Sequence, residues 1–128
     1  MKLMMQAAMI AGLLGAMAPS AMADCRKVIN LNSTGVARDA SGKAEVRQRG
    51  TRNKIKVEAE ARVANGTRYN VFANGVLLGA VTINLGEGEI EVDTGDGGVL
   101  PPGATNVCAV TSVEVRDGAG LAVLTGSF

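Results

Sequence analysis

The feature that most constrains the fold is a strict alternation of apolar and charged residues within positions 53–63. The apolar residues are Ile55, Val57, Ala59, Ala61 and Val63, and the charged residues between them are Lys54, Lys56, Glu58, Glu60 and Arg62. Successive side chains of a β-strand point to opposite faces of the sheet, so a period of two residues separates these groups onto two faces. The segment predicts a half-buried strand, and no helical period competes with it.

Seven further segments have the apolar runs or alternation of strands. They cover residues 26–32, 43–49, 68–73, 76–84, 86–94, 107–116 and 121–127. Asn74-Gly75 separates two of them, and this dipeptide is a strong signal for a tight β-hairpin because both residues accept a positive φ. The stretch from Asp117 to Gly120 is a second candidate hairpin.

The spacing of these segments predicts an all-β fold, because strands recur about every 8–12 residues and none of the segments has helix caps. We expect an antiparallel β-sandwich of about 7–8 strands, with a small closed β-barrel as the alternative. Val, Leu, Ile and Ala must form the core, since the chain has three aromatic residues. Residues 95–106 form the one long irregular stretch that we expect.

The first 23 residues predict a secretory signal peptide. Lys2 precedes an apolar run over residues 3–18, and Ala21-Met22-Ala23 provides small residues for cleavage before Asp24. A membrane anchor is the alternative, but the run is shorter than the roughly 20 residues that span a bilayer. Lipid attachment at Cys25 is a third possibility, disfavoured by Asp24 before it. We therefore expect one exported domain over residues 24–128, periplasmic or extracellular, with no membrane span after cleavage.

The chain contains two cysteines, Cys25 and Cys108. Export would place them in an oxidising compartment, so we expect one intramolecular disulfide. Such a bridge closes a loop of about 84 residues, which the chain-entropy account values at about 4–5 kcal/mol. Two free buried thiols or a bridge between chains are the alternatives.

The amino-acid composition of the chain excludes several classes of function. The chain has no His and no Trp, which removes His-based catalytic triads and His-rich metal sites, and no local motif supports another nucleophile. Residues 24–128 carry 12 positive and 12 negative side chains, so their net charge is zero. A neutral chain without exposed aromatic platforms does not favour nucleic acid as a partner. We expect a non-catalytic protein without a cofactor.

The charges are strongly segregated along the chain. Residues 24–68 hold 11 basic and 5 acidic residues, a net of +6, and residues 69–128 hold 1 basic and 7 acidic residues, a net of −6. The basic and acidic strand faces form a candidate interaction surface of Arg47, Arg49, Arg52, Lys54, Lys56, Glu87, Glu89 and Glu91. These stripes could pair within one molecule, between copies of the chain, or with a separate charged protein.

Two short segments suggest ligands. Asp93 and Asp96 lie in a Gly-rich stretch that resembles part of a calcium loop, although the twelve-residue calcium pattern is not met and a plain turn is the alternative. The basic cluster 47–54 could bind a phosphate or an acidic glycan, or be a solvated turn.

The sequence therefore favours a secreted, non-catalytic structural or interaction module, with self-association among its possibilities. The alternative is a binding module for calcium or an acidic glycan. An enzyme with an unrecognised site is a third and weaker hypothesis.

Overall fold

A computed structural model describes residues 24–128, so the predicted signal peptide lies outside the described residues. Eight antiparallel strands account for most of this range. They are β1 (Cys25–Ser33), β2 (Ser41–Arg49), β3 (Arg52–Glu60), β4 (Thr67–Ala73), β5 (Val76–Ile83), β6 (Glu87–Asp93), β7 (Ser112–Arg116) and β8 (Ala122–Ser127). Two short 3₁₀ turns, η3 (Thr94–Asp96) and η4 (Val107–Ala109), lie between β6 and β7. The all-β prediction with about eight strands is confirmed.

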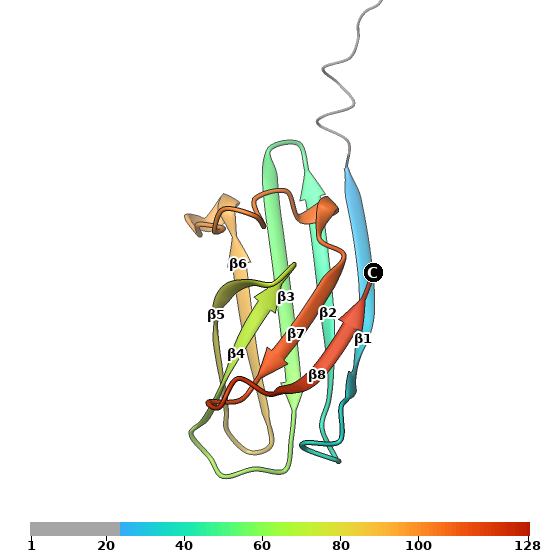
Figure 1. Ribbon diagram of the computed structural model, residues 1–128. Coiled ribbons are helices and arrows are strands. Elements are labelled where there is room, and N and C mark those ends of the chain that lie inside the picture. The colour runs from blue at the N-terminus through green and yellow to red at the C-terminus, as the bar shows by residue number, and fades with distance from the viewer. Residues whose placement is uncertain (1–23) are drawn as a thin grey trace, which may run out of the picture.

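The strands form one sheet in the order β5-β4-β7-β8-β1-β2-β3-β6. In Figure 1, β4, β7 and β8 lie in front of β1, β2, β3 and β6, so the sheet folds into two layers. The layers join where β1 pairs with β8, and this pairing covers only Asn32 with Thr125 and Ser33 with Leu124. The arrangement combines the expected sandwich with the alternative of a barrel, because one continuous sheet supplies both layers.

The sheet nearly closes where its two end strands, β5 and β6, approach each other. A Cβ at Gly88 would overlap the carbonyl oxygen of Thr82 and lie 2.7 Å from Cγ2 of Val81. A Cβ at Gly79 would lie 2.7 Å from Cδ1 of Ile90. The absence of side chains at these two glycines therefore allows the edges to come together.

Apolar side chains from both layers fill the interior. The alternation within residues 53–63 holds in the structure, since Ile55, Val57 and Ala59 are at most 1% exposed, while β3 itself ends at Glu60. Tyr69 is the only aromatic residue of the described core. The remaining buried apolar residues are Leu31, Ala40, Ala44, Val46, Ala61, Val71, Ala73, Val81, Ile83, Leu100, Ala104, Val107, Val110, Val113, Val115, Val123 and Leu124.

One predicted strand is shorter than expected. Residues 107–116 were expected to be extended throughout, but β7 begins only at Ser112 and is preceded by η4. The side chain of Asn106 accepts a hydrogen bond from the backbone N–H of Cys108 at 3.1 Å and so caps this turn. Apolar composition alone could not reveal the turn, because Val107 and Val110 are fully buried there as they would be in a strand.

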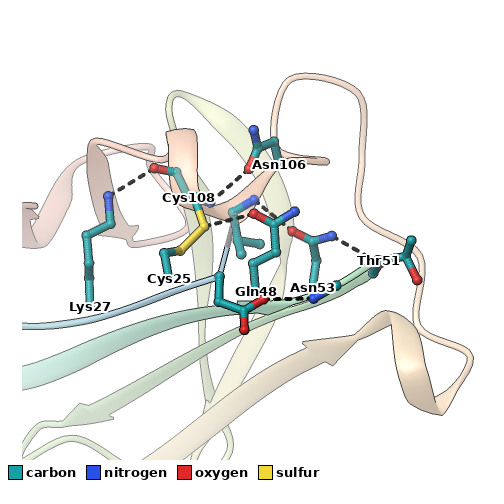
Figure 2. Close-up of a disulfide and its surroundings, with 10 residues drawn as sticks. Cys25, Lys27, Gln48, Thr51, Asn53, Asn106 and Cys108 are labelled. Carbon is teal, nitrogen blue, oxygen red and sulfur yellow. Dashed lines mark hydrogen bonds between the residues drawn. A yellow bond between two sulfur atoms is a disulfide. The ribbon is translucent and has the colours of Figure 1, made fainter. Parts of the chain in front are cut away.

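The predicted disulfide joins Cys25 of β1 to Cys108 of η4, with the two Cα atoms 6.0 Å apart. Figure 2 shows the bridge beside the amide side chains of Gln48 and Asn53. Both amides are buried, and the Asn53 Oδ1 accepts a hydrogen bond from the Val107 N–H at 3.2 Å. The bridge and this hydrogen bond together attach η4 to the end of the β1-β2-β3 layer. Within residues 24–128, no helix is long and apolar enough to cross a bilayer.

Candidate interaction face

The charged residues gather on the outer face of the layer formed by β1, β2, β3 and β6, which we call the charged face. The alternation that buries one side of each strand leaves the other side to solvent. The strand register then aligns the outward residues of neighbouring strands into rows across the sheet. One row near the β2–β3 hairpin, for example, contains Arg26, Arg47, Lys54 and Asp93.

The basic stripe of β3 and the acidic stripe of β6 are direct neighbours. Lys56 lies opposite Glu91, and the Lys54 Nζ is 3.8 Å from a carboxylate oxygen of Glu91. Glu89, and then Glu58, raise the pKa of Lys56 by stabilising its charged form. The stripes therefore pair within one molecule along the middle of the face, which is one of the arrangements that the sequence allowed.

One end of the charged face is basic. We define the basic end as Arg26, Arg47, Arg49, Arg52 and Lys54, which lie beside the β2–β3 hairpin at the top of Figure 1. Arg49 lies directly opposite Arg52, and Arg47 lies directly opposite Lys54. Like charges in such cross-strand positions destabilise a sheet. With the neighbouring Asp93 and Asp96, these five cations give a net charge of +3. Three further carboxylates border this end, since Glu45 contacts Arg26, Glu91 contacts Lys54 and Asp24 accepts from the N–H of Gly50.

The other end of the face is acidic. We define the acidic end as Glu58, Glu60, Glu87 and Glu89, where Glu58 lies opposite Glu89 and Glu60 lies opposite Glu87. On the far side of Glu58, β2 contributes Lys43. Four negative side chains and one positive side chain give a net charge of −3. The charged face is thus dipolar along its strands, and each end contains like-charged pairs.

Arg52 and Asp93 form the best-defined ion pair of the basic end. Nε and Nη2 of Arg52 donate to the two carboxylate oxygens of Asp93 at 2.9 and 2.8 Å. The Asp93 side chain is only 6% exposed, because Arg52 covers it. The arginine hydrogen bonds and the N–H of Gly95 lower the pKa of Asp93 to about 2, so it is ionised near neutral pH.

The calcium hypothesis for Asp93 and Asp96 receives no support from this geometry. The carboxylate of Asp93 is engaged by Arg52 and Gly95, and the Asp96 carboxylate lies 3.6 Å from the same guanidinium. Residues 24–128 contain no group of three or more His, Cys, Asp or Glu side chains placed to hold a metal ion. The short turn η3 matches the plain-turn alternative instead.

Sequence reasoning placed the eight proposed surface residues on two stripes but missed part of the face. Arg26 and Glu45 are also outward, and Arg26 Nε donates to Glu45 at 3.0 Å, which lowers the pKa of Glu45. Glu58 and Glu60 join Glu87 and Glu89 in the acidic end. The alternation that turns Glu58 and Glu60 outward was visible in the sequence. Which residues lie beside them depends on the strand register, which could not be predicted from the sequence.

Comparisons of the chain with protein-family models, with curated proteins and with solved structures found no significant match.

Proposed function

We propose that the protein is an exported, non-catalytic interaction module that self-associates through its charged face. The observation that carries this proposal is the match between the ends of the face, one with a net charge of +3 and the other with −3. Each end places like charges directly opposite one another, an arrangement that is unfavourable within a single chain. A second copy supplies the opposite charge to both ends at once.

A two-fold axis describes the simplest such complex. If the axis lies in the plane of the face and runs across the strands, the basic end of each copy meets the acidic end of the other. The contact is isologous, so it closes as a dimer and does not continue into a filament. This axis sets the middle row of Glu45, Lys56 and Glu91 against its own equivalents, like charge against like, so the attraction comes from the two ends alone.

Export is supported by two features. The predicted signal peptide over residues 1–23 directs secretion. The Cys25–Cys108 disulfide suits an oxidising compartment, such as the periplasm or the extracellular space.

Sedimentation velocity of the oxidised chain at low and high salt tests self-association. Screening shortens the Debye length from about 10 Å at 0.1 M salt to about 3 Å at 1 M. We expect a concentration-dependent dimer at low salt that dissociates at high salt, while the fold persists. A chain that stays monomeric at low salt and high protein concentration contradicts the proposal.

A charge-swap experiment tests the pairing of the two ends. The variant R47E/R49E makes the basic end acidic, and the variant E60K/E87K makes the acidic end basic. Neither variant should associate with itself, since each then opposes like charges in both halves of the interface. An equimolar mixture should form heterodimers, because one face is then largely negative and the other largely positive.

The matched control is R68E, which reverses an exposed charge on β4 in the other layer. It should associate as the parent chain does. Loss of association in the R68E variant would show that net charge and not the dipolar face governs assembly, and no recovery in the mixture would contradict the pairing of the two ends. The circular dichroism spectrum of each swapped variant reports whether it is folded.

A further inference from the structure

A small pocket of about 130 Å³ opens within the basic end of the charged face. Its lining consists of Arg47, Arg49, Arg52, Lys54 and Asp93. Four of these five side chains are cationic, and all four come from the two strands that flank the β2–β3 hairpin. A concave site lined by cations on rigid strands matches the requirements of an anionic group.

Two of the four cations lack a compensating carboxylate. Arg52 is paired with Asp93, and Lys54 lies 3.8 Å from Glu91. Arg47 and Arg49 form no salt bridge within residues 24–128, and each lies directly opposite another cation. The folded chain therefore holds uncompensated positive charge inside the pocket, and an anion placed there would relieve the repulsion.

The hairpin backbone and the Arg52 wall of the pocket are also held in position before any ligand arrives. The hairpin between Arg49 and Arg52 contains Gly50 at a φ of 61°, whose N–H donates to the Asp24 carboxylate at 2.9 Å. Two hydrogen bonds fix the Arg52 guanidinium on Asp93. A Cβ at Gly95 would overlap the Arg52 side chain, so Arg52 also packs closely on the backbone of η3. Binding sites that are ordered in advance lose less conformational entropy on binding.

We propose that this pocket binds a single oxyanion group, a phosphate, sulfate or carboxylate, through Arg47 and Arg49 with Lys54 and Arg52 at its sides. The planar guanidinium fork of arginine suits bidentate contact with such groups. The group can arrive as a free ion or as a substituent of an acidic glycan. This inference goes beyond the proposed self-association, because the pocket is complete in one chain.

The test is an NMR titration of the oxidised, isotope-labelled chain with inorganic phosphate, with sulfate and with a sulfated polysaccharide. Chloride is varied in the opposite direction so that ionic strength stays constant. The protein is kept dilute, where sedimentation shows a monomer. We expect saturable shifts of the backbone amides of Arg47, Arg49 and Arg52, and chloride alone should not reproduce them.

Variants separate recognition from charge. R47Q/R49Q should weaken phosphate binding about tenfold or more, since it removes the uncompensated cations and their charge-assisted hydrogen bonds. R47K/R49K keeps the charge but loses the guanidinium fork, and it should show an intermediate affinity. R68Q, on the outer face of the other layer, should bind as the parent chain does. The spectrum of each variant reports whether it is folded.

Shifts with the free ions and the polysaccharide support recognition of one oxyanion group, and saturable shifts with the polysaccharide alone support a glycan as its carrier. No saturable shift with any probe overturns the proposal. So does an R47Q/R49Q variant that binds like the parent chain. None of these outcomes decides self-association, which is measured separately by sedimentation.

Discussion

The two layers of the sheet differ in the number of charged residues that they carry and in how those charges are paired. Strands β1, β2, β3 and β6 contain fifteen charged residues, whereas β4, β5, β7 and β8 contain three, Arg68, Glu114 and Arg116. In the weakly charged layer, Arg116 donates to Glu114 at 2.8 Å and its guanidinium lies 4.0 Å from the ring centroid of Phe72. Charges there are mostly satisfied by their immediate neighbours.

The charged face satisfies only part of its charges in this way. Arg47 opposes Lys54, and Glu60 opposes Glu87, although exchanging one residue of either pair would create a salt bridge. Local conflicts of this kind concentrate at functional sites, where stability is given up for binding. This difference between the layers supports our proposal that the charged layer carries the interaction.

The largest expected effect comes from removing the link between the layers. The disulfide ties β1 of the charged layer to η4, shortly before β7 of the weakly charged layer, across a sequence separation of 83 residues. The double variant C25A/C108A should lose about 2–5 kcal/mol of unfolding free energy, because its unfolded chain is less constrained. Urea unfolding without reductant measures this, and an unchanged midpoint would contradict a stabilising role.

A smaller loss is expected where the end strands of the two layers approach. The substitution Gly88→Ala places a methyl group against the backbone of Thr82, so β5 and β6 must separate. We expect a loss of about 1–3 kcal/mol, as for overpacked cores. Gly118→Ala is the matched control, since a Cβ at Gly118 meets nothing within 4 Å. Equal unfolding midpoints for the two variants would mean that the near-closure contributes nothing.

A gain of about 1 kcal/mol is expected at the tip of the β5–β6 hairpin. Leu85 adopts a φ of 53° while 89% exposed, although this left-handed conformation costs a non-Gly, non-Asn residue about 1–2 kcal/mol. The equivalent position of the β4–β5 hairpin is Asn74, with a φ of 52°. Leu85→Asn should therefore raise the unfolding midpoint. The control Leu121→Asn is at an exposed site without a positive φ, so it should not raise the midpoint. Equal gains for the two variants would mean that replacing an exposed leucine by a polar residue, and not the backbone conformation, is the cause.

The last effect appears only in acid. Because the pKa of Asp93 is lowered from 3.8 to about 2, its ionised form stabilises the fold. This contribution is complete above about pH 4 and is lost as the pH falls through about 2. The variants D93N and R52Q should both flatten the decline of stability across that window, because each removes the Arg52–Asp93 pair. Urea unfolding at several acidic pH values measures the slope, and parallel profiles for the parent and D93N would contradict this role for Asp93.

Much of the strand content was predictable, and the reasons are local. Period-two alternation located β3 and β6, and Asn74-Gly75 located the β4–β5 turn, whose two residues have φ values of 52° and 77°. The start of β7 was not predictable in this way. A buried apolar run has the same sequence pattern whether it forms a strand or a turn. The turn at Val107–Ala109 depends on the Asn106 cap and on the disulfide to the distant Cys25.

The sequence by itself determined which residues face the core and which face solvent, because a strand's side chains alternate whatever strand lies beside it. It also predicted one bridge between its two cysteines, but free thiols and a bridge between chains stayed open until the structure placed Cys25 beside Cys108. Only the tertiary structure decided that β3 lies beside β6 and aligned Glu60 with Glu87. Register arises from long-range packing and turn geometry together, so the dipole of the charged face could not be read from any single segment.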